Sequence, residues 1–149
     1  MEKLTEWQAG EVQLSYKRKS ENKQKVVCAQ DCAHFFRSVY GDAIEHREQF
    51  IVAGLNRANK ITSYFVVSSG GVSSTVVDPK LVMQYLLLAN CSGFIVSHNH
   101  PSGTVRPSSQ DRALTRQLVE AGKILDIPLL DHVIITADSH YGFADHGEI

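Results

Sequence analysis

The sequence lacks the features of a secreted or membrane-spanning chain. No segment approaches the ~18 consecutive apolar residues of a membrane helix, and the N-terminus MEKLTEWQAG has no apolar run suited to a signal peptide. The three cysteines, Cys28, Cys32 and Cys91, are an odd number without paired spacing, so we expect buried, reduced thiols. These absences predict a soluble, cytoplasmic protein with no membrane association.

The sequence also lacks an excess of charge of one sign. Fifteen basic residues stand against sixteen acidic ones, and the formal net charge of −1 gives no reason to expect broad nucleic-acid binding. Five of the basic residues lie in YKRKSENKQK, residues 16–25. Because Tyr16 is the one aromatic residue in that run, we interpret it as a solvated segment, with a phosphate-contacting arm as the alternative.

Two catalytic patterns of nucleotide chemistry are incomplete or missing. A zinc deaminase needs a Cys-x-x-Cys pair beside its His-x-Glu, and the chain has no Cys-x-x-Cys. A phosphate-cradling glycine-rich loop is also missing, since Gly70-Gly71 is more typical of a turn. The sequence therefore gives little support to a nucleotide-processing hydrolase.

The overall composition is typical of a globular protein. With 149 residues, 43% hydrophobic and 21% charged, the chain suits one domain with a single core. Periodicity predicts strands at 10–19, 48–56, 61–71, 71–77, 93–97 and 131–144, the last as a strand followed by a hairpin. It predicts helices at 32–40 capped by Asp31, at 78–90 with Asp78 as N-cap and Pro79 first, and at 108–127 capped by Ser108 or Ser109.

These elements predict an α/β fold, in the α+β sense of one mixed sheet with helices against it. Residues 48–56 and 61–71 are expected to form a hairpin with Asn56 and Asn59 in its turn. Residues 1–24 are interpreted as an N-terminal extension with the first strand, and residues 25–149 as the domain.

The segment SHNHPSGTVRPSSQD, residues 97–111, carries the strongest chemical signal. Residues two apart on a strand point to the same side, so His98 and His100 converge where the buried strand ends. A helix beginning after Pro107 places Asp111 in its first turn. Two imidazoles and one carboxylate leave a fourth position open, as in catalytic zinc sites, and suit zinc better than magnesium or calcium. On spacing alone, a polar loop is an equal alternative.

The other histidines carry less signal. His34, His46, His140 and His146 are expected to be exposed. His132, beside Asp131, is interpreted as an exposed polar residue, with support of a metal ligand or of a neighbouring loop as the alternative.

The wording HNHPSG…PSxxD, followed by DHVII and an aromatic-Ala-acidic ending, resembles the RadC-like branch of the JAMM (MPN+) metalloenzymes over about residues 25–149. The resemblance implies a single JAMM/cytidine-deaminase-like domain. It implies zinc ligands at His98, His100 and Asp111, and an oxyanion-stabilising serine at Ser108. Glu48 matches the family's general base, which acts through the metal-bound water; Glu45 is the near competitor. The implied reaction is hydrolysis of a peptide or isopeptide amide.

The chain departs from full-length RadC proteins, which carry an N-terminal helix-hairpin-helix region. It resembles the short RadC-like proteins of bacterial mobile elements, which weakens any inference of DNA repair. Gly142 also stands where many relatives have serine. The alternative function is an accessory or binding module in bacterial DNA repair or recombination with a non-catalytic metal site. The expected partner is an unidentified protein or peptide substrate. Nucleic acid has weak support, and a homo-oligomer formed through exposed sheet edges is a further alternative.

Overall fold

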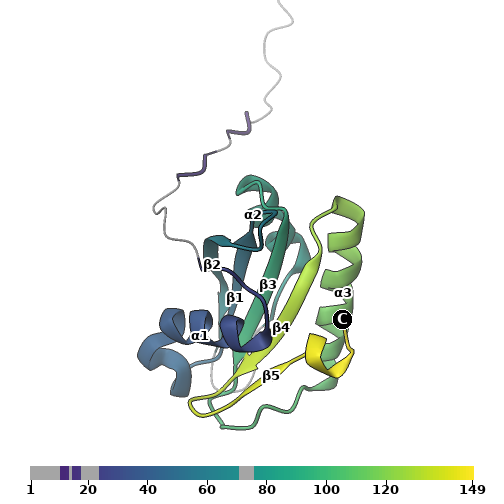
Figure 1. The fold of residues 1–149 in the computed structure, drawn as a ribbon. Coiled ribbons are helices and arrows are strands. Elements are labelled where there is room, and N and C mark those ends of the chain that lie inside the picture. The colour runs from purple at the N-terminus through teal and green to yellow at the C-terminus, as the bar shows by residue number, and fades with distance from the viewer. Residues whose placement is uncertain (1–10, 14, 18–23, 71–75) are drawn as a thin grey trace, which may run out of the picture.

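The computed structural model describes residues 11–13, 15–17, 24–70 and 76–149, and its centre is a five-stranded mixed sheet (Figure 1). The strand order is β2-β1-β3-β4-β5, and β3 and β4 are parallel while the other pairs are antiparallel. The strands are β1 (Gln49–Leu55), β2 (Ile61–Ser69), β3 (Gly93–Asn99), β4 (Leu129–Ile135) and β5 (His140–Gly142). The helices are α1 (Ala29–Tyr40), α2 (Pro79–Leu88) and α3 (Ser109–Leu125), with short 3-10 helices η1 (Gly41–Glu45) and η2 (Ala144–His146).

Helices cover both faces of the sheet, because the central strands are apolar on both sides. Helix α1 packs on one face, where Phe36 and Tyr40 contact the side chains of alternate strand residues such as Ile51 and Ile95. Helices α2 and α3 pack on the other face, around Val96 and its neighbours. Figure 1 shows α1 and α3 on opposite sides of the sheet. The predicted α/β class, with one mixed sheet in one domain, is confirmed.

The predicted starts of two helices are confirmed and one is wrong. Asp78 accepts the Lys80 backbone N–H ahead of Pro79 in α2, and Ser108 caps α3. Helix α1 begins earlier than expected, with Cys28 as its N-cap. Asp31 lies inside the first turn and accepts the backbone N–H groups of Val27 and Cys28 through Oδ2. Asp31 therefore stabilises the helix start from within the helix.

The β1–β2 hairpin forms as predicted. Asn56 Oδ1 accepts the N–H groups of Ala58 and Lys60, and Asn59 takes a positive φ of 56°. Residues 24–26 pair alongside this turn, where the Val26 N–H donates to Asn59 O at 2.8 Å.

The strand predicted at 10–19 is wrong for its described residues. Residues 11–13 and 15–17 have no strand structure, although the Tyr16 hydroxyl donates to Thr62 O at 3.0 Å. Alternation of apolar residues makes a strand only where a neighbouring strand offers a ladder of hydrogen bonds. The strand predicted at 71–77 lies mostly outside the described residues, and Val76 and Val77 are not in a strand.

The cysteines follow the prediction in part. Cys32 and Cys91 are buried and Cys28 is exposed, and all three are free thiols. Within the described part of the chain, no helix is both long and apolar enough to cross a membrane.

Candidate metal centre

His98 and His100 converge where β3 ends. His98 pairs with Phe50 of β1 on one side and with Ile134 of β4 on the other, and the residue is 3% exposed. His100 follows the strand directly. The Nε2 atoms of the two rings are 2.9 Å apart, which confirms that period-2 alternation brings them together.

Asp111 reaches the histidines from the first turn of α3. Its Oδ1 is 3.3 Å from His98 Nε2 and its Oδ2 is 3.7 Å from His100 Nε2. The carboxylate is held by a capping box, because Ser108 N–H donates to Asp111 Oδ2 at 2.8 Å and Asp111 N–H donates to Ser108 Oγ at 3.0 Å. Burial raises the pKa of the Asp111 carboxyl, but the hydrogen bonds with Ser108 help to hold this pKa well below its ordinary value. Asp111 therefore presents an ionised carboxylate.

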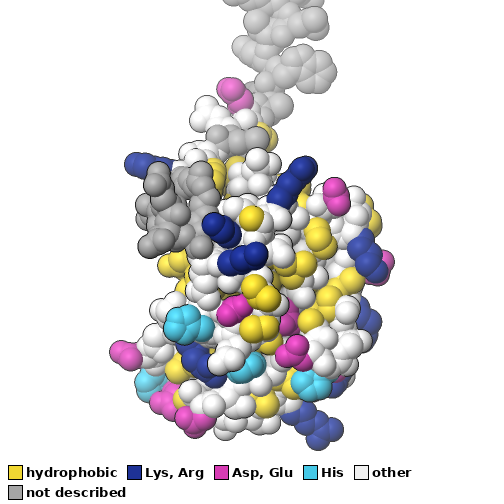
Figure 2. Space-filling model, in the orientation of Figure 1, with side chains coloured by type: hydrophobic (Ala, Val, Ile, Leu, Met, Phe, Trp, Pro, Cys, Tyr) yellow, Lys and Arg dark blue, Asp and Glu magenta, His cyan; other side chains and the backbone are white. Residues whose placement is uncertain are grey.

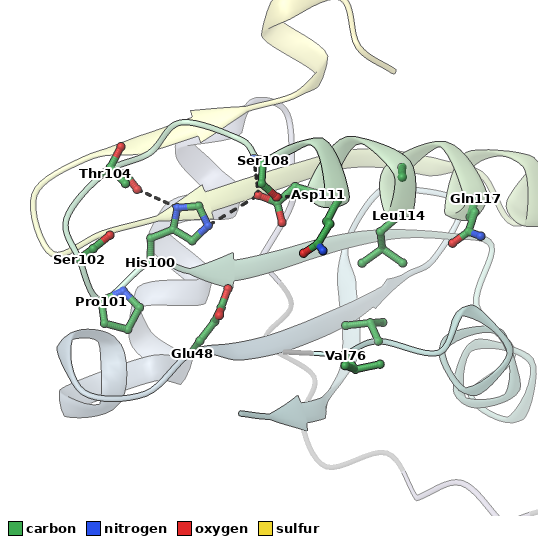
Figure 3. A pocket seen from close by; sticks show the side chains of 13 residues that line it. Glu48, Val76, His100, Pro101, Ser102, Thr104, Ser108, Asp111, Leu114 and Gln117 are labelled. Carbon is green, nitrogen blue, oxygen red and sulfur yellow. Dashed lines mark hydrogen bonds and ion pairs between the residues drawn. The ribbon is translucent and has the colours of Figure 1, made fainter. Parts of the chain in front are cut away.

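His100 is oriented by the loop between β3 and α3. Its Nδ1 lies 2.8 Å from the carbonyl oxygen of Thr104 (Figure 3). A carbonyl oxygen only accepts, so Nδ1 carries the ring proton. The Nε2 lone pair of His100 consequently faces His98 and Asp111, which is the protonation that a metal ligand needs.

Glu48 joins this group from the residue just before β1. One carboxylate oxygen of Glu48 and one ring nitrogen each of His98 and His100 lie within 4.8 Å of one another. Figure 3 shows Glu48 and Asp111 reaching His100 from two different elements. Glu45, the competitor, instead lines a surface pocket beside Arg37. The structure thus brings together all five residues singled out from the sequence: Glu48, His98, His100, Ser108 and Asp111.

The donor set suits a zinc ion. Two imidazole nitrogens with carboxylates on either side match the ligand types of catalytic zinc sites, whereas magnesium and calcium prefer oxygen ligands. The bare Nε2 of His100 lies 2.9 Å from a second ring nitrogen and close to an ionised carboxylate, and a cation bound between these groups would stabilise them.

The asparagine between the two histidines holds the segment that carries Glu48. Asn99 is fully buried and points to the opposite face of β3. Its Oδ1 accepts the Gln49 N–H at 2.8 Å, and its Nδ2 donates to Ile44 O at 2.9 Å and Arg47 O at 2.8 Å. This role of Asn99 was not predicted from the sequence. The signal was its position on a strand buried on both faces, because a buried amide must find hydrogen-bond partners.

The expectation that His132 and Asp131 are surface polar residues is wrong. His132 is fully buried and Asp131 is 6% exposed, because β4 is a central strand covered on both faces. Burial lowers the pKa of His132 well below its usual range. Its Nε2 lies 2.7 Å from His98 Nδ1, so His132 contacts a residue that is predicted to be a metal ligand.

Asp131 does not contact His98 and instead binds backbone N–H groups, one of them in the C-terminal segment. Its Oδ1 accepts the backbone N–H groups of His132 at 2.8 Å and Ala144 at 3.0 Å. Burial raises the pKa of Asp131 to about 6, since these hydrogen bonds offset the lost hydration only in part. Gly142 packs here, where an added Cβ would lie 2.8 Å from Ala29 Cβ and 3.2 Å from Asp131 Oδ2. A serine at this position would require its neighbours to shift.

A groove of about 630 Å³ opens onto the site. Glu48, His100, Ser108 and Asp111 line one end of this metal-site groove, and Val76, Val77 and Leu114 line its continuation along α3 (Figure 3). Three of the four remaining histidines, His34, His46 and His146, are exposed as predicted, and His140 is half-buried. On the face shown in Figure 2, the visible histidines lie in the half of the molecule that contains β5 and η2.

A buried strand leading into His-x-His, a capped helix that supplies an aspartate and a glutamate just before the neighbouring strand form a candidate metal site like the one that the resemblance to JAB/MPN proteins implies. The family profile of the RadC-like JAB domain matches residues 26–148, and the chain belongs to this family. The chain is 39% identical over 124 residues to a UPF0758 protein of Flavobacterium johnsoniae, covering 83% of this chain and 53% of the relative. A UPF0758 protein of Salinibacter ruber is 40% identical over 134 residues, with coverage of 89% and 56%.

A shorter relative is the UPF0758 protein YfjY of Escherichia coli, 39% identical over 101 residues, which is 68% of this chain and 63% of that protein. The chain thus spans about half the length of the first two relatives and somewhat more of the third.

Proposed function

We propose that this chain is a zinc-dependent metallopeptidase or isopeptidase that hydrolyses an amide bond in a protein or peptide. One observation carries the proposal. Two histidine nitrogens and two carboxylates converge at the end of a groove, and the ring proton of His100 is committed to Thr104 O, on the side away from the other donors. A structural zinc site is usually closed by four ligands, whereas this donor set borders an open groove.

We assign His98, His100 and Asp111 as the metal ligands and Glu48 as the general base. Asp111 is the better ligand because the capping box with Ser108 fixes its carboxylate against both rings. Glu48 lines the groove, and one of its carboxylate oxygens lies within 4.8 Å of a ring nitrogen of each histidine. The bound zinc would supply a Lewis acid that polarises the amide carbonyl and activates a water molecule.

The residues of the chain supply the proton transfers. Glu48 takes a proton from the attacking water and passes it to the departing amine, so that amide and water give a carboxylic acid and an amine. Ser108 uses its oxygen to accept the Asp111 N–H, and its own hydroxyl proton stays available to donate into the groove. We assign that proton to the oxyanion that develops on the carbonyl oxygen.

The decisive experiment compares Glu48→Gln with Glu45→Gln. Protein termini and isopeptide bonds are catalogued across a bacterial lysate treated with the wild type or with each variant, and zinc content is measured in parallel. We expect Glu48→Gln to keep its zinc and lose cleavage, while Glu45→Gln, an exposed acid nearby, cleaves as the wild type does. Undiminished cleavage by Glu48→Gln would show that another group is the base, and wild-type protein without bound zinc would refute the metal assignment.

The alternative of a DNA repair or recombination accessory module has less support. The net charge is −1, and basic and acidic side chains are both scattered over the face in Figure 2. Tight, salt-dependent DNA binding by the wild type together with no detectable cleavage would favour that alternative.

A further inference from the structure

The ring of His132 lies directly behind His98, on the sheet face that α3 covers. Its Nε2 is 2.7 Å from His98 Nδ1, and its Nδ1 is 2.7 Å from Thr115 Oγ1. The ring is fully buried and stacked on Phe143 with 4.5 Å between the ring centroids. A positive charge would be costly in this apolar setting. The ring of His132 is therefore neutral and carries a single N–H.

The hydroxyl of Thr115 decides which nitrogen of His132 carries that proton. Thr115 Oγ1 is 2.7 Å from the backbone carbonyl oxygen of Asp111, one turn earlier in α3. Because a carbonyl oxygen only accepts, the single hydroxyl proton points to Asp111. The hydroxyl oxygen then accepts from His132, so the His132 proton is on Nδ1.

The position of the proton on His132 also determines which nitrogen of His98 is protonated. A neutral His132 with its proton on Nδ1 offers a bare Nε2, which accepts the Nδ1–H of His98 across 2.7 Å. The Nε2 of His98 is left with its lone pair toward His100 and Asp111. We propose that Thr115 and His132 are positioning residues that hold His98 in the tautomer able to bind a metal ion. This inference rests on the metal site of the proposed function and adds the residues that prepare one of its ligands.

The opposite direction of these hydrogen bonds would block the site. If Thr115 donated to His132, then His132 would donate to His98 Nδ1, and the proton of His98 would sit on Nε2, where a metal ion has to bind. The hydrogen bonds from His98 through His132 to Thr115 thus form a relay. His100 needs no such relay, because the carbonyl of Thr104 fixes its proton directly. His98 faces another imidazole, which donates or accepts equally well. Its tautomer therefore has to be set one residue further away.

The relay also joins two ligands of the site. Asp111 ends the chain of hydrogen bonds with its backbone carbonyl and contributes its carboxylate to the metal centre. His98 begins the chain with Nδ1 and faces the same centre with Nε2. A shift of the first turn of α3 would move the Asp111 carboxylate and release the Thr115 hydroxyl together. We therefore expect the tautomer of His98 to depend on the docking of α3.

The first test reads the tautomers directly in the wild type. Long-range ¹⁵N–¹H correlations of the imidazole rings are recorded on zinc-free protein at about pH 8.5, two units above the ordinary histidine pKa. We expect His132 to carry its proton on Nδ1, and His98 to carry a proton on its own Nδ1. A proton on His132 Nε2, or a bare Nδ1 on His98, would overturn the inference, and this measurement requires neither a variant nor bound metal.

The second test compares Thr115→Val with Thr115→Ser. Valine keeps the shape of threonine and removes the hydroxyl, so His132 loses its acceptor and its proton is expected to move to Nε2. We expect zinc affinity, measured by competition with a chelator, to fall about 10- to 100-fold in Thr115→Val, with His98 shifted toward the Nε2–H tautomer. Thr115→Ser retains the hydroxyl and should bind zinc as the wild type does. Wild-type zinc affinity in Thr115→Val would contradict the relay.

His132→Phe provides an independent variant. It keeps an aromatic ring against Phe143 and removes both nitrogens, and we expect the same loss of zinc affinity. Zinc binding by His132→Phe as tight as that of the wild type would also overturn the inference. If instead the wild type itself bound no zinc, the proposed function would fail, while the ring correlations would still decide the direction of the relay.

Discussion

The side-chain oxygen of Asn99 accepts the backbone N–H of Gln49 at 2.8 Å. Gln49 is the first residue of β1 and directly follows Glu48. The segment His98-Asn99-His100 therefore uses both faces of one strand. The two histidines face α3, and the side-chain amide of Asn99 faces α1. The residue between two proposed metal ligands thereby fixes the backbone next to the proposed base.

We predict that Asn99→Ala destabilises the fold and displaces Glu48. The change leaves the carbonyls of Ile44 and Arg47 and the N–H of Gln49 without their partner. Unpaired buried groups cost about 1–3 kcal/mol each, and water will reach some of them, so the free energy of unfolding should fall by about 2–4 kcal/mol. Urea denaturation measures this loss. Ser102→Ala, at an exposed residue of the metal-site groove, serves as the control.

The same variant separates the base from the ligands. Because Asn99 holds the Glu48 segment, we expect Asn99→Ala to lower kcat more than it lowers zinc affinity. An equal loss of zinc would mean that the amide supports the histidines and not Glu48. Full stability of Asn99→Ala would show that water replaces the amide without cost.

The sequence predicts the parts of the site that depend on local geometry. Period-2 alternation places His98 and His100 on one side, and the capping preference of Ser108 brings Asp111 to the start of α3. These inferences need only neighbours along the chain. The hairpin turn at Asn56 and Asn59 is predictable for the same reason.

The parts that were missed depend on what covers each face. His132 follows an aspartate near a strand start and looks polar, but it lies in a central strand under α3, where its ring is fully buried. In the sequence, Asn99 looks like a spacer between the two histidines, because its partners in and after η1 lie far from it along the chain. The predicted strand at 10–19 has the right alternation, yet residues 11–13 and 15–17 pair with no strand among the described residues. Periodicity predicts whether a face of a strand or helix is apolar or polar. Which element packs against that face depends on the tertiary structure.

We predict that zinc stabilises the protein. A ligand that binds only the folded state adds about 2.7 kcal/mol at a free concentration one hundred times its Kd. Differential scanning calorimetry should therefore show a higher Tm with zinc than after chelation. His100→Ala should lose this shift, whereas His46→Ala, which removes an exposed histidine, should keep it. An undiminished shift in His100→Ala would place the zinc elsewhere.

We predict that the buried Asp131 makes stability fall as pH rises from 4 to 7. Burial raises the pKa of Asp131 in the folded state to about 6, above its ordinary value of 3.8. The folded state therefore binds this proton more tightly than the unfolded state does. The resulting stabilisation is fully present below the ordinary pKa and is lost as pH rises through about 6. Two pKa units correspond to about 3 kcal/mol.

Asp131→Asn tests this pH dependence, because asparagine keeps an oxygen for the N–H groups of His132 and Ala144 and cannot ionise. Urea denaturation of both proteins between pH 4 and pH 7 gives the difference in their free energies of unfolding. We expect this difference to shift in favour of Asp131→Asn by up to about 3 kcal/mol as pH rises. A difference independent of pH would show that Asp131 has an ordinary pKa in the folded protein.

The apolar part of the metal-site groove is expected to select substrates without affecting the metal. Leu114 lies one turn after Asp111 on α3 and lines the groove with Val76 and Val77, so it would contact a side chain next to the scissile amide. Leu114→Ala removes that contact, and kcat/KM for bonds flanked by large apolar residues should fall about tenfold, since lost apolar contacts in a pocket cost about 1–3 kcal/mol. Zinc affinity should not change. Ile124→Ala, which alters an 83% exposed apolar residue further along the same helix, is the control. A Leu114→Ala enzyme with wild-type kcat/KM on every substrate would mean that the substrate leaves the site by another route.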